Sequence, residues 1–91
     1  LYSKFVKMEN YLKNIQNKLK EKISFERIEI INNTHKHEKH KFFSKDKCHL
    51  HLKIKSSYLK SISSLNAQKL IMNILKKDLE EKIHALEISI E

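Results

Sequence analysis

Residues 48 to 55 alternate strictly between apolar and polar side chains, and this pattern constrains the fold more than any other feature of the sequence. The apolar set is Cys48, Leu50, Leu52 and Ile54, and the polar set is His49, His51, Lys53 and Lys55. Because successive side chains of a strand point to opposite faces, the segment is predicted to be a strand with one apolar and one wet face. Such a strand belongs in a sheet that is covered on one side only.

The remaining periodic segments predict the elements that cover and extend this sheet. Apolar residues at steps of three and four predict helices over residues 5–23 and from Ser64 or Asn66, as the capping residue, to Leu79. Residues 28–31 and 84–90 are predicted to be strands, and Tyr58, Leu59 and Ile62 suggest a short helical turn. In the second helix, Lys76, Lys77, Asp78, Glu80, Glu81 and Lys82 are expected on the exposed side.

These elements give an α+β fold of order α-β-β-α-β, with helices on one face of a three-stranded mixed sheet. The second and third strands are expected to be parallel neighbours, since the connection between them crosses over a helix. The order is that of KH-like folds of the second type. The KH clamp on RNA needs a GxxG loop, however, and this chain has no glycine.

The length of 91 residues suits one domain, residues 1–91. Because the chain opens with Leu1 rather than Met, residues 1–7 are expected to be the remnant of a longer N-terminal extension. No apolar run is long enough to cross a bilayer, so no membrane association is expected. The single cysteine excludes an internal disulfide and fits a reducing intracellular compartment, mitochondrial or cytoplasmic. We expect the isolated domain to be a monomer.

A net charge of +8 raises nucleic acid as a partner. We do not favour it, because Arg27 is the only arginine and an abundance of Lys, Asn and Ile also arises from compositional drift of a coding sequence. Enzymatic activity is not expected either. The chain has no glycine for a phosphate loop or a nucleophile elbow, and its acidic residues fall on faces predicted to be solvated.

Histidine is the residue type that most suggests a site. His84 shares the parity of Leu86, Ile88 and Ile90, so its ring is expected on the helix-covered side of the third strand or at its rim. It is either a partly buried ring bonded to backbone or a metal ligand on a rigid strand end, and periodicity does not choose between them.

The polar segment 35–47 is predicted to be a long mobile loop, and it carries further histidines at His35, His37 and His40. Imidazole suits zinc, copper and iron–sulfur centres, but these spacings specify no known site, and solvated loop histidines are the plainer interpretation. Cys48 has core parity and is interpreted as core filler before ligand. His49 and His51 are interpreted as members of the wet face.

Three segments of the chain resemble the BolA-like protein family. Residues 48–56, Cys-His-Leu-His-Leu-Lys-Ile-Lys-Ser, resemble the family's Ser-His-Phe-Lys-Val-x-Ile-Val-Ser strand. Ile83-His84-Ala85-Leu86 resembles its terminal Val/Ile-His-Ala-Leu motif, with no gap between the two, and residues 28–34 resemble its Leu-Glu-Val-x-Asp/Asn-Glu-Ser. The resemblance covers about residues 8–90.

The resemblance implies a partner protein rather than a substrate. Members of the family pair with monothiol glutaredoxins, and the heterodimer holds a 2Fe–2S cluster with the glutaredoxin cysteine, glutathione and two ligands from the BolA-like chain. The first would be His84. The second would come from the loop, His37 or His40, with Cys48 ranked third. No cofactor is then expected in the isolated domain.

The sequence departs from the family at two places. Leu59-Lys60-Ser61 replaces Phe-x-Gly, and Ala67-Gln68-Lys69 replaces Arg-His-Arg/Lys on the second helix. Only Lys69 persists from that basic triplet. The alternative function, a KH-like nucleic-acid binder or transcriptional regulator, would therefore use Lys69.

Overall fold

The computed structural model describes residues 2–33 and 48–91, with side chains from residue 8 onward. Its elements follow the predicted order: α1 (Tyr2–Lys22), β1 (Arg27–Asn32), β2 (Cys48–Lys55), α2 (Ser57–Lys60), α3 (Ser64–Ile74), α4 (Lys76–Glu81) and β3 (Ile83–Ile90). The second predicted helix is divided, because Leu75 leaves helical geometry at φ −97° and ψ 16°. The predicted α+β fold is confirmed.

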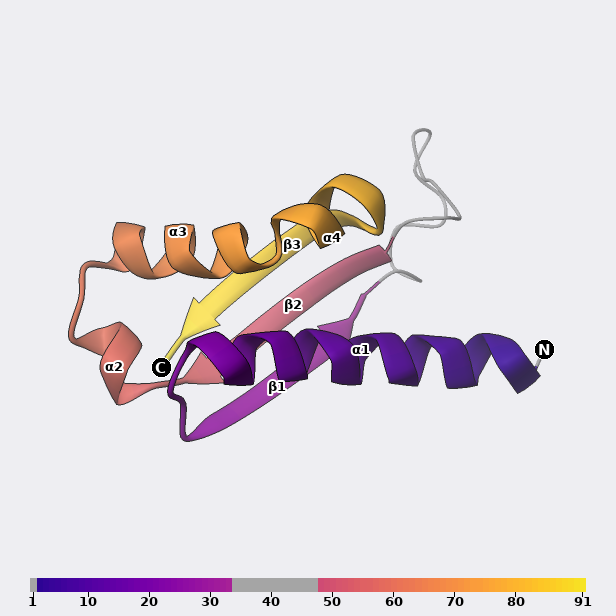
Figure 1. Ribbon diagram of the computed structural model, residues 1–91, viewed down its shortest axis with the longest axis horizontal. Helices are drawn as coiled ribbons and strands as arrows, with labels where there is room; N and C mark the ends of the chain where they lie inside the picture. Colours follow the sequence, from indigo (N-terminus) through magenta and orange to yellow (C-terminus); the bar gives the residue numbers. More distant parts are fainter. Residues whose placement is uncertain (1, 34–47) are drawn as a thin grey trace.

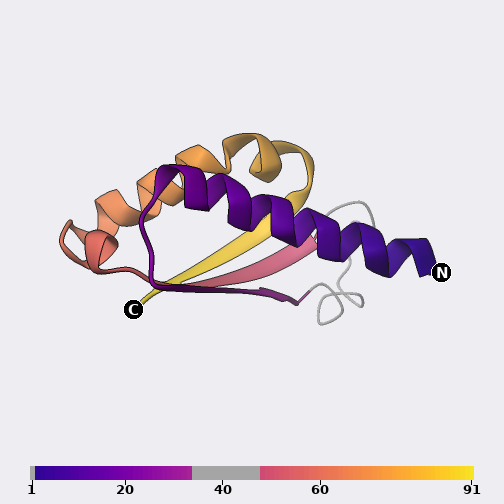
Figure 2. The ribbon, with the colours of Figure 1, turned by 60° about the horizontal axis from the view of Figure 1, so that its bottom comes forward.

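The molecule has two layers, with the helices on one side of the sheet (Figures 1 and 2). The strands are ordered β1-β2-β3, so β2 is central. It pairs antiparallel with β1 and parallel with β3, as predicted. The other face of the sheet, which no described helix covers, is called the open face below.

The core lies between the central strand and the helices. The apolar residues of β2 that face the helices, Leu50, Leu52 and Ile54, are at most 3% exposed. The helices contribute a matching set of residues, each also at most 3% exposed: Ile15, Leu19, Ala67, Ile71 and Leu75. Burying each large aliphatic side chain contributes roughly 1.5–3 kcal/mol, so these contacts account for the main driving force for folding.

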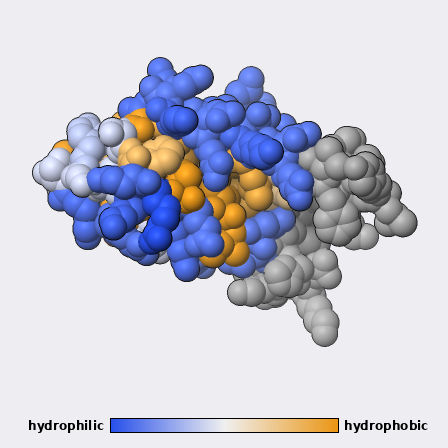
Figure 3. Space-filling view, turned by 90° about the horizontal axis from the view of Figure 1, so that it is seen from below, coloured by the Kyte–Doolittle hydropathy of each residue, from blue (hydrophilic) through white to orange (hydrophobic). Residues whose placement is uncertain are grey.

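The two edge strands bury their apolar side chains less completely than β2. Ile28 and Ile30 of β1, and Ile88 and Ile90 of β3, are only partly buried although they pack against the core. Figure 3 views the molecule from the side on which α1 and β1 lie in Figure 1, and an apolar area occupies the middle of that face. The sheet therefore exposes apolar surface at its margins.

Serine side chains organise the turns around α2 without glycine. The buried Ser56 hydroxyl donates to the carbonyl of Ser24 at 2.6 Å and accepts from the amide of Leu59 at 3.1 Å, which caps α2. Ser63 caps α3 by accepting from the amide of Asn66 at 3.1 Å, so the predicted cap at Ser64 or Asn66 is one to three residues late. No residue in the described part of the chain has positive φ.

Within residues 2–33 and 48–91, no helix combines the length and apolarity needed to cross a bilayer.

Candidate metal centre

His84 lies near the start of β3 and is exposed. Of the two positions expected for its ring, the helix-covered side of the third strand and the rim, this exposure excludes the first. The ring lies beside that of His49, with 4.9 Å between centroids and 48° between planes. His49 alternates with the buried Cys48 and Leu50, so both rings belong to the open face.

A shift in the register between β2 and β3 explains the position of His84. Cys48 pairs with Ile83, but the next residue, His49, pairs with Ala85, so His84 is an extra residue on β3. An extra residue of this kind interrupts the alternation of a strand. Ile83 remains in the core, whereas His84 and Ala85 are both exposed.

The spacing of the two rings is compatible both with an ordinary ring–ring contact and with coordination of a single metal ion. Two imidazoles on one tetrahedral ion, with metal–nitrogen bonds of about 2.0–2.1 Å, hold their centroids roughly 5 Å apart. The observed 4.9 Å agrees with that value. His49, which the sequence pattern assigned only to the wet face, is therefore a candidate ligand. The sequence held a sign of this role. His49 is the second residue of the motif 48–56, and a parallel pairing of the two strands places the start of that motif beside the terminal motif 83–86.

His51 also lies on the open face but has local partners on β3. Its Nε2 shares a hydrogen bond of 2.7 Å with Ser89 Oγ, and its Nδ1 lies 3.6 Å from a carboxylate oxygen of Glu87. The Nε2 contact is a hydrogen bond, whereas the Nδ1 contact is an ion pair only when the ring is protonated. His51 is therefore a structural cross-strand residue and serves as a comparison for the other two histidines.

Cys48 occupies the opposite face of β2, as its core parity predicted. The side chain is buried, and its thiol donates to the carbonyl of Lys82 at 3.3 Å. Burial raises the pKa of the thiol above its ordinary value. Since a metal is bound by thiolate, burial and the raised pKa both disfavour Cys48 as a ligand.

Cys48 should accordingly be unreactive in the folded protein. We expect a thiol reagent such as DTNB to modify it at least about 100-fold more slowly in buffer than in denaturing urea, because reaction requires local opening. Absorbance of the released thionitrobenzoate measures the rate. Rapid stoichiometric reaction of the native chain would contradict the burial and return Cys48 to the list of candidate ligands.

The remaining predicted site residues fall into two groups. His35, His37 and His40 lie outside the described residues. Lys69 is exposed on α3, a different element from those that carry His49 and His84. Its contact with nucleic acid stays a prediction.

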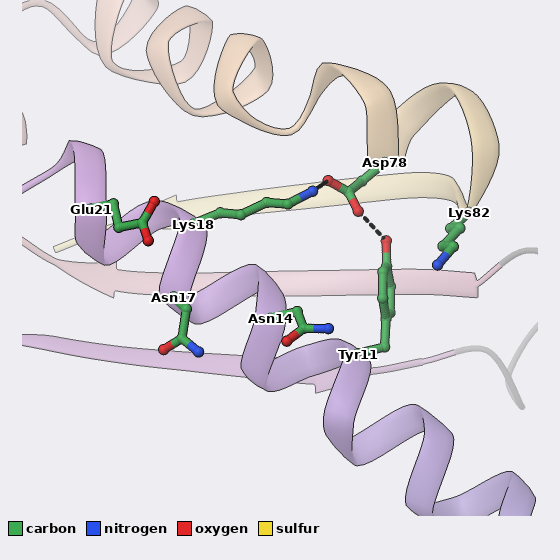
Figure 4. A pocket seen from close by; sticks show the side chains of 7 residues that line it. All are labelled: Tyr11, Asn14, Asn17, Lys18, Glu21, Asp78 and Lys82. Atoms are coloured by element: carbon green, nitrogen blue, oxygen red, sulfur yellow. Dashed lines mark hydrogen bonds and ion pairs between the residues drawn. The ribbon is translucent and has the colours of Figure 1, made fainter.

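Asp78, expected on the exposed side of its helix, is buried instead and joins α4 to α1. One carboxylate oxygen accepts from the Tyr11 hydroxyl at 2.9 Å, and the other lies 2.7 Å from Lys18 Nζ (Figure 4). Burial acts to raise the pKa of Asp78, but these two hydrogen bonds and the charge of Lys18 outweigh it and hold the pKa below its ordinary value. The three residues line a groove of about 320 Å³ between the helices.

The Asp78 network is connected to the segment that carries His84. The backbone amide of Lys82 donates to the carbonyl of Asp78 at 2.8 Å, and the Lys82 carbonyl accepts from the amide of Cys48 at 2.9 Å. Ile83, buried at 2% exposure, then begins β3. The end of α4 is thus fixed to both α1 and β2 immediately before the histidine.

Among the residues that the structure describes, no three His, Cys, Asp or Glu side chains are placed to hold a metal ion together. The His49–His84 pair supplies two nitrogens, which is half of a tetrahedral ligand set. Helices over one face of a mixed sheet (Figure 1), with the exposed His84 and the partly buried His49 on the other, define a small α+β domain with two neighbouring imidazole rings on its open face.

The chain belongs to the BolA-like protein family. The sequence profile of that family matches residues 19–91, which confirms the resemblance found in the sequence motifs. A protein of Sinorhizobium sp., described as an uncharacterized protein in the cobS 5' region, is 33% identical over 76 residues, which are 81% of this chain and 82% of that protein.

Solved structures agree with this assignment. The BolA domain of SufE1 from Arabidopsis thaliana superposes with a TM-score of 0.73, at 24% identity and 87% coverage of each chain. BolA1 from the same plant gives a TM-score of 0.72, at 19% identity and 86% coverage of each chain. At these identities the likeness establishes the fold.

Proposed function

We propose that this protein is an adaptor that binds a 2Fe–2S cluster together with a monothiol glutaredoxin, in the assembly or transfer of iron–sulfur clusters or in iron regulation. His84 supplies one ligand, and the glutaredoxin cysteine and glutathione complete the other side. The observation that carries the proposal is the exposed His84 ring beside His49 on the open face. A histidine retained only for packing would have its ring among core side chains.

The second ligand from this chain is His49 or a histidine of the segment 35–47, His37 or His40. His49 is supported by its distance, since the ring pair already has the spacing for one tetrahedral metal ion. Iron–sulfur centres with two histidines on one iron have higher reduction potentials than those with cysteine alone. Such a cluster would be suited to transfer or sensing.

Reconstitution tests the proposal directly. The full chain is mixed with a monothiol glutaredoxin, glutathione, ferrous iron and sulfide under anaerobic conditions. We expect size-exclusion chromatography with light scattering to show a heterodimer. Its visible charge-transfer absorbance spectrum should differ from that of the cluster-bound glutaredoxin homodimer. Pulsed electron paramagnetic resonance on the reduced cluster should then detect imidazole nitrogens, two of them if both ligands of this chain are histidines.

Substitution of the loop histidines separates the candidates for the second ligand. If the chain with His37 and His40 replaced by glutamine still shows two coupled nitrogens, His49 is the second ligand; if one coupling disappears, the ligand belongs to the loop. A cluster that forms with no nitrogen coupling from this chain would contradict the proposed function. Failure of the heterodimer to form with competent glutaredoxin would do so too.

A further inference from the structure

The carbonyl of Lys82 is the fixed point from which β3 starts. It accepts from the backbone amide of Cys48 at 2.9 Å and from the thiol of the same residue at 3.3 Å. The amide of Lys82 donates to the carbonyl of Asp78 at 2.8 Å, which ends α4. The peptide groups on the two sides of Lys82 are therefore both bonded, one to the helix and the other to the central strand.

The extra residue of β3 comes directly after this point. Cys48 pairs with Ile83, whereas Leu50 pairs with Leu86, so three steps along β3 match two steps along β2. The pairing beyond the shift is fixed by the core, since Leu50 is 3% exposed. Because both ends of this stretch are held, the extra residue has to be accommodated between them, at His84.

The alternation of β3 by itself favours another arrangement. Continued back from Leu86 without an extra residue, it would place His84 opposite Cys48, on the helix-covered side of the sheet. The imidazole would then lie among core side chains and away from His49. In the structure the place opposite Cys48 is taken by Ile83 instead.

The thiol of Cys48 adds a side-chain bond where a strand ordinarily contributes only its backbone. The side chain is 5% exposed, so water does not compete for the Lys82 carbonyl. Burial raises the pKa of the thiol, so the proton that it donates stays in place. A thiol is a weak donor, but this one acts beside the register shift, where a change of one residue reverses the direction of His84.

We propose that Cys48 is a positioning residue for His84. Its thiol and its amide together hold the Lys82 carbonyl, so that β3 begins one residue early and the ring of His84 turns toward His49. Cys48 thus serves the imidazole pair from the opposite face of the sheet, without contacting a metal. Its importance for ligation rests on the proposed function, whereas its effect on the ring does not.

NMR spectroscopy of the isotope-labelled full chain, without iron or glutaredoxin, tests this placement. In the wild-type protein we expect nuclear Overhauser effects between the rings of His49 and His84, whose centroids are 4.9 Å apart. Cys48→Ala should weaken them and speed hydrogen exchange of the amide at position 48 about threefold, as expected for loss of a weak hydrogen bond. Cys48→Ser, whose hydroxyl can donate to the same carbonyl, should restore both.

Two controls separate this local effect from a general loss of stability. The amide of Ser56 donates to the carbonyl of Glu91 at 3.0 Å, at the far end of the same strand pair. Its exchange should stay within about twofold in Cys48→Ala. Ile71→Val, a truncation at a fully buried position of α3, should leave the contact between the two rings unchanged.

The comparison of donors decides the outcome. Unchanged ring contacts and exchange in Cys48→Ala would overturn the proposal, and so would a Cys48→Ser protein that behaves like Cys48→Ala. If Cys48→Ala does not fold, Cys48→Val takes its place, since valine fills the site without a donor. Weakened ring contacts in Ile71→Val would overturn the proposal too, because the ring would then respond to any loss of core packing.

The reconstituted heterodimer tests the consequence for ligation. Cys48→Ala should shorten the lifetime of the cluster about threefold, in proportion to the loss of the bond, while Cys48→Ser should keep it. An equal lifetime for the wild-type protein and Cys48→Ala would overturn the positioning role in ligation. Because the NMR comparison needs neither iron nor glutaredoxin, failure of this proposal is distinguishable from failure of the proposed cluster function.

Discussion

Replacing His84 by alanine is expected to shorten the lifetime of the reconstituted cluster in the heterodimer by at least about tenfold. Loss of a residue that merely orients a metal ligand already costs about 10–100-fold in metal affinity, and loss of a ligand should cost no less. Since His84 is exposed, the free energy of unfolding should change by less than about 0.5 kcal/mol. Decay of the visible absorbance after addition of a chelator measures the effect, and urea unfolding checks the fold.

His51→Ala is the matched control, because His51 lies on the same face but is bonded to Ser89. It should leave cluster lifetime within about twofold, at a modest cost of about 1 kcal/mol in stability. His84→Cys should restore a stable cluster with a lower reduction potential, since thiolate replaces imidazole. Equal lifetimes for the wild-type protein and His84→Ala would remove His84 from the ligand set.

Removal of the charge at Asp78 is expected to cause the largest loss of stability among the polar residues described above. In Asp78→Asn the ion pair with Lys18 is lost and one acceptor oxygen remains in place of two, so Lys18 and Tyr11 can no longer both donate to this side chain. We expect a loss of about 2 kcal/mol, below the full cost of breaking a buried ion pair because the Lys18 side chain is 47% exposed. For a domain of this size that corresponds to a decrease of about 10 °C in Tm.

The pH dependence identifies the carboxylate as the cause. The folded pKa of Asp78 lies below the ordinary value of 3.8, so its charge stabilises the fold fully above that value and progressively less as pH falls through the folded pKa. The stability difference between the wild-type protein and Asp78→Asn should be constant from pH 7 to about pH 5 and decrease below about pH 4.

Glu80→Gln, an exposed neighbour on α4, is the control and should change stability by less than about 0.5 kcal/mol at every pH. Urea unfolding of the wild-type protein and of both variants at pH 3, 5 and 7 measures the differences in the free energy of unfolding. A deficit in Asp78→Asn that is as large at pH 3 as at pH 7 would attribute the effect to packing rather than to the ion pair.

Periodicity was sufficient to predict the order of elements, because each strand and helix carries its own apolar pattern. The same reasoning placed His84 on the helix-covered side of the third strand or at its rim, and only the rim is compatible with its exposure. The helix-covered alternative fails because of the register shift between Cys48 and His49, which depends on how β3 meets β2 and leaves no trace in the alternation of residues 84–90. An assignment of faces from alternation alone assumes that each residue of the strand pairs with one residue of its neighbour, without a bulge.

Asp78 was missed for a different reason. It follows Leu75 by three residues and Ile71 by seven, which is the spacing of the buried stripe of its helix. Its polar type led to an exposed assignment, although the partners that stabilise a buried carboxylate, Tyr11 and Lys18, lie seven residues apart on one face of α1. The spacing within each segment was thus consistent with a buried Asp78. That α1 packs against α4 and brings Tyr11 and Lys18 to it could not be predicted from either segment alone.

The absence of positive φ in the described backbone has a practical consequence for mutagenesis. In many domains, alanine at a left-handed turn position introduces backbone strain that is hard to separate from the loss of a contact. Here the turns, including those on either side of α2, use conformations that alanine can adopt. A systematic alanine scan of residues 8–33 and 48–91 would therefore report side-chain energetics position by position, with no correction for backbone geometry.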